Sequence, residues 1–476
     1  MTDRLQRFSR EALGRIHDAS MDILARTGIC FNSEKAVRLF KGHGLKTDGN
    51  KVFFTENSIV SALETIPPRF TVKARNPDKD LIVGEDHYIF LSTGGAPNIA
   101  MPSGGIRPAV MADFQTCCKL VQTSDQVDMG ASLMVQPNDI PPETAHLDML
   151  ETYISLCDKP IFGASHKAEA ALDSIRMAAM VWGREETIPD APVLLTNTNA
   201  MSPLQYAQDQ SEVIMEMARW CQPVVISTMV LAGSTGPVSL PGLLVLQNAE
   251  ILAGMVLAQL VNPGTPVVYG STSVPMDMMH MTSATGAPET SRIASATAQI
   301  ARYYNVPCRA GGMLTDAHCT DAQALAESTL LLSTAVRDGA HFIFHATGQM
   351  GSYLSMGFEK WIIDEEVCAM VRSLFTPMDI TVETVDLETI RLVGQGGEYL
   401  THPKTFGQFK DLFQPGLFNR KPHEKWLAAG GETIIDTAGK TLEQRLESYQ
   451  APPIDAGVQN AIQEYVTLKK TSKNIN

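Results

Sequence analysis

The sequence predicts an α/β fold, a closed TIM (β/α)8 barrel with an N-terminal helical segment and a C-terminal α-rich cap. Short apolar runs recur through the middle of the 476-residue chain, and each is followed by a polar loop and a stretch with helical spacing. Eight such units are typical of a closed parallel sheet without an exposed edge. In such barrels the chemistry lies at the carboxyl ends of the strands, so the residues after each run are the candidates for a site.

Residues 1–80 are expected to form helices and a β-hairpin. Three helical patterns begin just after residues that favour an N-cap, namely Ser9, Ser33 and Thr55. The alternating pattern over 69–75 predicts a strand, and residues 80–91 predict a further strand pair. We therefore separate this segment from the barrel that follows.

Residues 81–375 are expected to form the barrel. Its strand runs are Tyr88–Leu91, Met129–Val135, Pro160–Gly163, Pro192–Leu195, Pro223–Thr228, Pro266–Tyr269, Val306–Arg309 and His341–His345. The stretch Gly242–Val261 is apolar nearly all round, which predicts a helix buried between the sheet and another layer. After about residue 375 the pattern stops, and 376–476 is expected to cap the barrel or to dock a partner.

Composition excludes several classes of function. The net charge of −14 disfavours nucleic acid as a partner, because phosphates require a basic face. The eight cysteines form no C-x-x-C pair, which indicates reduced thiols and a cytoplasmic protein. The longest purely apolar-and-glycine stretch, 251–258, falls short of the ~20 residues of a membrane span. Dinucleotide, Walker and nucleophile-elbow motifs are also absent from the sequence.

The loops after the strand runs carry amides, hydroxyls and glycines, with one guanidinium and one imidazole but no paired carboxylates. The side chains of interest are Asn197, Asn199, Arg309, His345, Tyr353 and Phe358. This set predicts a site that holds a polar ligand with few proton-transfer groups. Each residue also has a structural explanation: the asparagines as helix caps, the arginine paired with an acid, the histidine hydrogen-bonded in the core.

A zinc site is a further alternative. Cys308, His318, Cys319 and His345 lie on neighbouring units and offer zinc-ligand chemistry. A buried thiol beside a hydrogen-bonded imidazole explains the same residues without metal, so we predict no metal site.

Several motifs resemble the trimethylamine methyltransferase superfamily. They are the segments 233–250 (GSTGPVSLPGLLVLQNAE), 262–270 (NPGTPVVYG), 199–204 (NAMSPL), 314–323 and 394–400 (GQGGEYL). The resemblance covers nearly the whole chain. It implies a TIM barrel that transfers a methyl group from an amine to the Co(I) corrinoid, a cobalamin-type cofactor, of a separate protein.

One departure from the family indicates a particular branch. Trimethylamine enzymes carry pyrrolysine near the segment 315–323, which here reads TDAHCTDAQ and contains only ordinary residues. The chain therefore resembles the branch without pyrrolysine, whose members demethylate quaternary amines such as glycine betaine. Glycine betaine is the best single candidate, and proline betaine, carnitine and γ-butyrobetaine are close rivals. A quaternary ammonium leaves as a neutral tertiary amine, so we expect no catalytic acid or base.

The resemblance suggests roles for the residues expected to bind substrate: Arg309, His345, Asn197, Asn199, Tyr353, Phe358 and Glu250. Arg309 and His345 would meet the substrate carboxylate, and the two asparagines would orient it. Tyr353 and Phe358 would contact the trimethylammonium group. Glu250 would either compensate the positive charge or serve as a structural hydrogen-bond acceptor.

Two other classes of function stay open at this stage. One is a barrel that binds a betaine without turning it over, and the other is a metal-dependent lyase or hydrolase on the same fold. For the favoured function we expect a corrinoid protein that docks at the barrel mouth and the C-terminal tail. We also expect a homo-oligomer, with no nucleic-acid or membrane partner.

Overall fold

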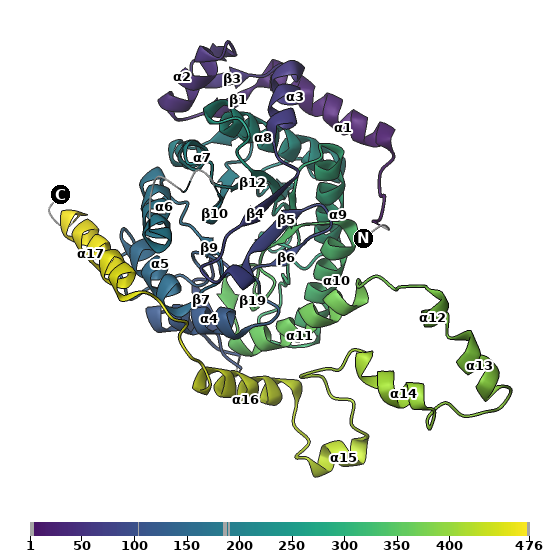
Figure 1. Cartoon of the computed structure of the whole chain (residues 1–476). Helices are drawn as coiled ribbons and strands as arrows, with labels where there is room; N and C mark the ends of the chain where they lie inside the picture. The colour runs from purple at the N-terminus through teal and green to yellow at the C-terminus, as the bar shows by residue number, and fades with distance from the viewer. Residues whose placement is uncertain (1–3, 103, 184–187, 189–190, 474–476) are drawn as a thin grey trace.

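A curved parallel sheet lies at the centre of the computed structural model, which describes residues 4–102, 104–183, 188 and 191–473, and helices surround the sheet (Figure 1). Its strands, in spatial order, are β6 (Ile89–Phe90), β18 (Phe342–Ile343), β17 (Cys308–Arg309), β14 (Val267–Ser271), β12 (Val224–Thr228), β10 (Leu194–Ala200) and β9 (Ile161–Phe162). All seven fall on predicted runs. The first of them in sequence, β6, pairs with the last, β18, through Ile89 and Phe342.

The predicted strand Met129–Val135 is wrong as a regular strand. Met129 makes one isolated parallel bridge to Leu91, and no ladder joins this segment to β9 among the described residues. The side chain of Tyr153 occupies that position instead. Its hydroxyl accepts the N–H of Gly130 at 3.1 Å and donates to the carbonyl of Pro160 at 3.0 Å, so one side chain replaces the missing backbone pairing.

The helices that surround the sheet follow its strands in sequence. They are α4 (Met111–Thr123), α5 (Ala145–Leu156), α6 (Ala168–Trp182), α7 (Gln208–Arg219), α8 (Leu240–Val261), α9 (Pro288–Tyr303), α10 (Ala322–Asp338) and α11 (Phe358–Leu374). Among the described residues, α8 alone has the length and mean hydropathy, 1.6, of a candidate membrane span, and 83% of that stretch is buried inside the fold. The predicted buried helix is confirmed: α8 packs between β12 and β14 on one side and α1 (Arg10–Asp22) and α3 (Glu56–Thr65) on the other.

The N-terminal helices begin where the sequence predicts. The side chains of Ser9, Ser33 and Thr55 each accept a backbone N–H of the first turn of α1, α2 (Glu34–Gly42) and α3. Between these helices lies a small sheet in the order β11 (Gln205–Tyr206), β1 (Ile29–Phe31), β3 (Lys51–Phe53) and β2 (Lys46–Asp48). Since β11 follows β10, this sheet ties the N-terminal segment to the central one.

The strand predicted at 69–75 is β4 (Arg69–Val72), and it pairs with β5 (Leu81–Gly84) in a hairpin that covers the amino end of the sheet (Figure 1). The strand pair predicted within 80–91 is wrong as a pair, because β5 joins β4 whereas β6 joins the central sheet. Just after β4, the N–H of Lys73 donates to the carbonyl of Pro192, which precedes β10. Just after β5, the carbonyl of Glu85 lies 2.9 Å from Nε2 of His341, which precedes β18. The hairpin therefore spans the strand starts and leaves the carboxyl end of the sheet uncovered by these two strands.

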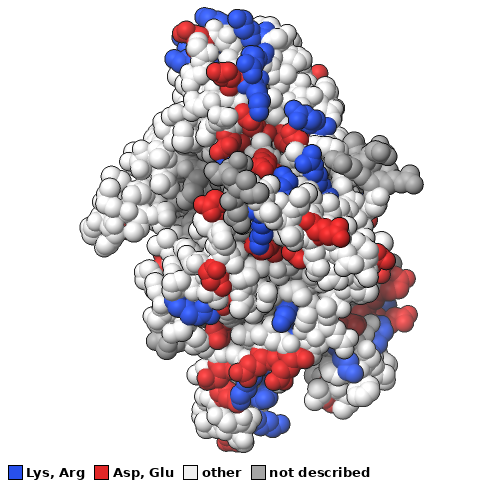
Figure 2. Space-filling view, turned by 90° about the vertical axis from the view of Figure 1, so that its left-hand side faces the viewer, with Lys and Arg blue, Asp and Glu red and all other residues white. Residues whose placement is uncertain are grey.

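The C-terminal residues are helical, but they lie along the outer helices. Helix α16 (Ile434–Glu447) packs on α11 and α4, and α17 (Ala456–Lys473) packs on α5 and α6. Before them, an arm leaves the body of the protein (Figure 1) and holds α12 (Val382–Val385), α13 (Leu387–Val393), α14 (Pro403–Gln408) and α15 (His423–Ala428). On the side shown in Figure 2, acidic and basic side chains are intermixed.

Candidate substrate site at the carboxyl end of the sheet

Arg309 ends β17, and strand alternation points its side chain into the interior of the curved sheet. In the neighbouring ladder, Tyr269 pairs with Cys308 and Gly270 pairs with Arg309. The hydroxyl of Tyr269 donates to Asn248 on α8, so Tyr269 and Cys308 face the helices. Gly270 and Arg309 consequently face the interior.

The glycine beside Arg309 keeps this part of the interior open. A Cβ atom on Gly270 would lie 2.0 Å from Oγ of Ser227, so a larger residue would clash with that side chain on the next strand. Ser227 in turn donates to Oδ1 of Asn197 at 2.9 Å, and Nδ2 of Asn197 donates to Oδ1 of Asn199 at 3.3 Å. Both asparagines therefore lie on β10 and face the interior, rather than capping the following helix.

The guanidinium of Arg309 is buried without an acceptor. The residue is 2% exposed, and Nε and Nη1 have no hydrogen-bond partner among the described residues. Burial lowers the pKa of Arg309 to about 10, which still leaves the group charged at neutral pH. An unpaired buried charge is strongly unfavourable, and a guanidinium fork fits a carboxylate with two parallel hydrogen bonds. The arrangement can therefore bind an anionic group of a ligand.

His345 follows β18 and lies beside Arg309 in a conformation with φ +60°. Its ring stacks on Phe344 at 4.2 Å between centroids and meets the edge of Tyr353 at 5.2 Å, while Nδ1 has no partner in the described part of the chain. Burial, and next the charge of Arg309, lower the pKa of His345 to about 3, against a hydrogen bond with Gln349. The imidazole is therefore neutral at physiological pH and offers a hydrogen bond without a charge.

Three more polar atoms on the loop after β18 are buried and lack partners among the described residues: the Tyr353 hydroxyl, Thr347 Oγ1 and Gln349 Nε2. Burial raises the pKa of Tyr353 to about 12, with Arg309 opposing the shift, so this hydroxyl keeps its proton. We call Arg309, His345, Thr347, Gln349 and Tyr353 the inner cluster. Buried polar groups are normally hydrogen-bonded, so this set of exceptions indicates a ligand site.

Aromatic rings line the interior below the inner cluster. Phe162 on β9 meets Phe342 and Phe344 of the β18 segment across the interior, with centroids 6.2 and 5.6 Å apart. The Arg309 guanidinium carbon lies 5.5 Å from the centre of the Phe344 ring. These rings provide an apolar, cation-tolerant surface next to the anion-binding group.

Sequence reasoning missed Thr347, Gln349 and the phenylalanines. Thr347 and Gln349 come directly after the eighth run, so the rule that pointed to His345 also covers them. Phe162 and Phe344 lie inside or at the end of apolar runs, where a phenylalanine is interpreted as an ordinary core residue. They differ from core residues only because their side chains point to the inner side of the sheet.

Phe358 and Glu250 lie outside the inner cluster. Phe358 begins α11 and packs half-buried against the core. Glu250 lies on α8, where its carboxylate accepts the Ser202 hydroxyl and the N–H of Leu204, each at 2.7 Å. Burial raises the pKa of Glu250 to about 7, against these two hydrogen bonds. The contacts match the structural role weighed for Glu250, which is to hold the loop after β10.

The residues considered for zinc do not converge. Cys308 faces the helices, whereas His345 lies at the interior, and the Cys319 thiol interacts with Asp321. Among the described residues, no group of three or more histidine, cysteine, aspartate or glutamate side chains is placed to hold a metal ion.

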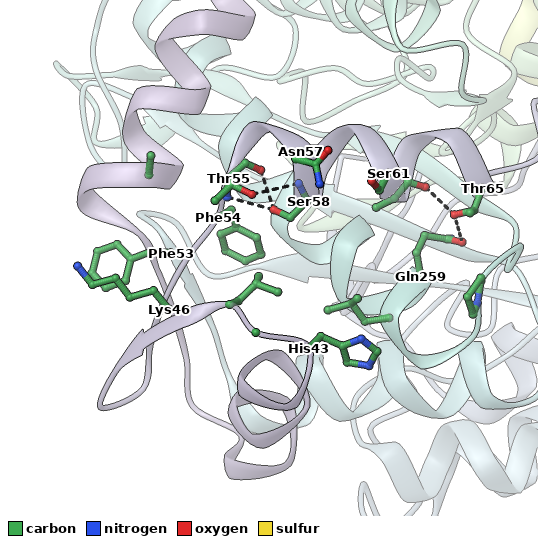
Figure 3. Close-up of a pocket in the computed structure, with 16 residues that line it drawn as sticks. His43, Lys46, Phe53, Phe54, Thr55, Asn57, Ser58, Ser61, Thr65 and Gln259 are labelled. Carbon is green, nitrogen blue, oxygen red and sulfur yellow. Dashed lines mark hydrogen bonds between the residues drawn. The ribbon is translucent and has the colours of Figure 1, made fainter.

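A surface pocket of about 780 Å³ lies between α3, β3 and α8 (Figure 3). Two pairs of its polar side chains are hydrogen-bonded, Ser58 with Thr55 and Thr65 with Gln259. No described residue that lines this pocket has a buried side-chain polar atom without a partner, in contrast to the inner cluster.

Known proteins of one family are similar to this chain over nearly its whole length. The family described as trimethylamine methyltransferase (MTTB) matches residues 2–474. A glycine betaine methyltransferase of Desulfitobacterium hafniense (strain Y51) is 36% identical over 97% of this chain and 96% of the relative. A proline betaine:corrinoid methyltransferase of Eubacterium limosum is 31% identical over 95% of each chain. A solved structure of the hydroxylamine MtmB complex aligns over 91% of this chain and 94% of that one, with 14% identity and a TM-score of 0.49.

Proposed function

The chain belongs to the trimethylamine methyltransferase family, and on that basis we propose that it removes a methyl group from a carboxylate-bearing quaternary amine. Glycine betaine, which would leave as dimethylglycine, is the best single candidate. Proline betaine, carnitine and γ-butyrobetaine are the rivals, and they differ in the length or shape of the chain that joins the nitrogen to the carboxylate.

The unpaired guanidinium of Arg309 carries this proposal. A substrate such as trimethylamine has no anionic group, so it would leave Nε and Nη1 of Arg309 buried without acceptors. A betaine supplies a carboxylate for this fork and a quaternary nitrogen a few bonds away. Two of the relatives carry the name of a betaine methyltransferase, which supports the same substrate class.

The methyl acceptor is proposed to be the Co(I) corrinoid of a partner protein, as the name of the Eubacterium limosum relative suggests. The corrinoid supplies the nucleophile: its electron pair forms the new bond to carbon while the C–N electron pair stays on nitrogen. The amine leaves neutral, so no proton has to move. That chemistry fits His345 and Tyr353, which are both uncharged at neutral pH.

The residues of this chain then act by binding and alignment. Arg309 holds the carboxylate, His345 and the amides of the interior fix its orientation, and the rings of Phe344 and Tyr353 contact the methyl groups. Fixing the substrate in one orientation converts a collision into an aligned displacement, which contributes several powers of ten to a rate. Phe358 stays a prediction for the same ammonium contact.

We also infer that the curved sheet is the closed (β/α)8 barrel that the sequence predicts. The pairing of β6 with β18, the contact of Phe162 with Phe342 across the interior and the bridging hydroxyl of Tyr153 support closure. A cytoplasmic location and a homo-oligomer stay predictions. Sedimentation of the purified protein tests the second.

Methyl transfer to free cobalamin tests the proposed function. The protein is mixed with chemically reduced Co(I) cobalamin and each betaine in turn, and the visible spectrum reports methyl–cobalt formation. We expect turnover with at least one betaine and none with trimethylamine. Tight binding of a betaine without transfer would instead indicate a binding protein. Activity that depends on an added metal, with no methyl–cobalt formed, would indicate the lyase or hydrolase.

A further inference from the structure

The arm, residues 377–431, begins beside the amino end of the central sheet. Thr376 and Pro377 follow α11 and line a hollow together with Leu81 of β5 and Tyr88, which lies just before β6. The inner cluster lies at the opposite end, where β17 and β18 finish. The arm therefore leaves the body on the side away from the substrate site.

Along most of its length the arm has no core beneath it. Between 376 and 430, where every residue is described, Thr389 alone is buried. A contact with α11 holds the arm midway, because the carboxylate of Glu366 accepts the N–H groups of Gly416 and Leu417 at 3.1 Å each. Figure 1 shows α12, α13 and α14 extended beyond the ring of helices. Within one chain, the arm therefore has little packing of its own.

The arm exposes a large amount of hydrophobic surface. Thirteen of its large hydrophobic side chains are between 44% and 86% exposed, including those of Val382, Leu392, Leu400 and Phe406. Burying one side chain of this kind removes about 60–120 Å² from water, so the arms of two chains together could bury on the order of 1,000–2,000 Å². Stable, specific interfaces bury about 1,200–2,000 Å². The exposed surface is therefore large enough for a stable contact between two proteins.

The charges of the arm separate along its length. Residues 377–400, the acidic half, contain five acidic side chains and one basic one, whereas residues 401–425, the basic half, contain five basic side chains and two acidic ones. One ion pair, Lys404 with Asp386, already joins the two halves within an arm. Two such arms that lie antiparallel place the acidic half of each against the basic half of the other. The arm is therefore complementary to a second copy of itself.

We propose that two copies of this chain associate through their arms around a two-fold axis, with the acidic half of each arm against the basic half of its partner. A two-fold axis makes every contact twice, so a surface that is complementary to itself is what it requires. Because the arms begin at the amino end of each sheet, this pairing leaves both carboxyl ends free for ligands. The exposed hydrophobic side chains supply the buried area, and the charges set the antiparallel orientation.

A membrane and the protein that carries the methyl acceptor are poorer occupants of the arm. An anionic lipid surface attracts basic segments but repels the acidic half, which lies in the same continuous surface. An acceptor protein has to reach the inner cluster, whereas the arm starts at the opposite end of the sheet. A second copy meets both the charge pattern and the area.

The first test replaces hydrophobic side chains of the arm and measures mass by sedimentation equilibrium. Leu392→Glu/Leu400→Glu places two charges on the arm, and Leu468→Glu on α17 is the matched control at another leucine that is exposed. We expect the wild type and the control to have twice the mass of one chain. The arm variant should have the mass of one chain, with self-association weakened roughly 100-fold or more. Its affinity for the betaine should stay unchanged, since the arm does not reach the inner cluster.

The second test exchanges charges to check the antiparallel orientation. Glu383→Lys/Glu388→Lys makes the acidic half basic, and Lys410→Glu/Lys421→Glu makes the basic half acidic. Each variant alone should self-associate at least roughly tenfold more weakly than the wild type, because like charges then face each other. An equimolar mixture of the two should recover pairs, each with one chain of either kind. A mixture that stays as single chains, or variants that pair as well alone as the wild type, would overturn the proposed orientation.

Other occupants of the arm would give different results. A wild type that stays a single chain, or a Leu392→Glu/Leu400→Glu variant with the mass of the wild type, overturns the proposal. A single-chain wild type that floats with phosphatidylcholine–phosphatidylglycerol vesicles would assign the arm to a membrane instead. An arm variant that stays paired but loses affinity for a cobalamin-loaded carrier protein would assign it to that carrier. Sedimentation needs no substrate, so this proposal stands or falls independently of the proposed function.

Discussion

On helix α11, Nζ of Lys360 lies 2.7 Å from Oδ2 of Asp364, and neither side chain is exposed to solvent. The same ammonium group donates to the carbonyl of Met313, and the same carboxylate accepts the N–H of Gly348 at 2.7 Å. The N–H of Met313 in turn donates to the carbonyl of His345. This buried ion pair therefore joins the loop after β17, which follows Arg309, to the loop after β18, which carries the other members of the inner cluster.

Removing one member of that pair should destabilise the protein. Asp364→Ala leaves the ammonium of Lys360 buried without its carboxylate, so we expect the free energy of unfolding to fall by about 3–5 kcal/mol. Lys360→Met/Asp364→Leu removes both charges and should recover most of the loss. Urea unfolding measures both. A single variant as stable as the wild type would show that the pair does not hold these loops.

Replacing Arg309 should weaken betaine binding selectively. Arg309→Met removes a charged two-pronged contact worth about 1.5–3 kcal/mol, which corresponds to a rise in Kd for glycine betaine of roughly 10- to 100-fold. Arg302→Met is the matched control, because Arg302 donates to the carbonyl of Asp338 at the amino end of the sheet. Calorimetry reports both constants. An unchanged Kd in Arg309→Met would remove this residue from carboxylate binding.

The pH dependence of binding should reflect a neutral histidine and a titrating arginine. The pKa of His345 is lowered to about 3, so this residue stays neutral between about pH 5 and about pH 8 and should cause no change in Kd over that range. The pKa of Arg309 is lowered to about 10, so its charge, and with it the affinity, should be lost as pH rises toward that value. Titration of Kd against pH checks both parts. An inflection near the ordinary histidine pKa of about 6.5 that disappears in His345→Gln would contradict the first.

The ring of Tyr353 should matter more than its hydroxyl. A quaternary ammonium group has no N–H to donate to this hydroxyl, so Tyr353→Phe should keep Kd for glycine betaine within about threefold. Tyr353→Leu removes the aromatic face and a contact of about 1–2 kcal/mol, so roughly tenfold weaker binding is expected. Tyr303→Leu on α9 provides a control ring at the other end of the molecule. Equal affinities for Tyr353→Phe and Tyr353→Leu would refute a cation–aromatic contact at this position.

Helix α17 should depend on Asp173 in a pH-dependent way. Burial raises the pKa of Asp173, but hydrogen bonds from His146, Lys469 and Tyr465 outweigh burial and lower it below its ordinary value. The carboxylate therefore adds stability above the unfolded pKa of about 3.9, and this contribution is lost as pH falls below it. Asp173→Asn should lower the free energy of unfolding by about 3 kcal/mol at neutral pH.

Urea titrations at neutral and acid pH check that prediction for Asp173. The gap between wild type and Asp173→Asn should narrow as the medium becomes acid, because the wild-type carboxylate becomes protonated. A gap of the same size at both values would mean that the charge of Asp173 does not stabilise the packing of α17.

Much of the fold could be predicted from local pattern. Apolar runs with helical stretches between them located seven strands of the central sheet, and N-cap residues located the first three helices. The strand predicted at Met129–Val135 did not form, because strand pairing depends on the neighbouring segments and not on the run itself. The hydroxyl of Tyr153 takes the place of a ladder, and nothing within the run itself reveals that.

The site residues also divide into those that local pattern could locate and those that it could not. The sequence could predict that Arg309 and His345 lie close together. Arg309 ends one strand and His345 follows the adjacent parallel strand, and the carboxyl ends of parallel strands meet at one edge of a sheet. Glu250 could not be placed, because helical periodicity does not tell which buried loop a side chain will hold. Phe344 could not be distinguished from ordinary core without knowing which side of its strand faces inward.

A structure of the protein with glycine betaine bound tests the central claim most directly. The two carboxylate oxygens are expected within hydrogen-bonding distance of Nε and Nη1 of Arg309, with the trimethylammonium group against the aromatic rings and one methyl group toward the open carboxyl end. A complex in which the guanidinium still lacks an acceptor, while the betaine occupies another part of the molecule, would contradict it.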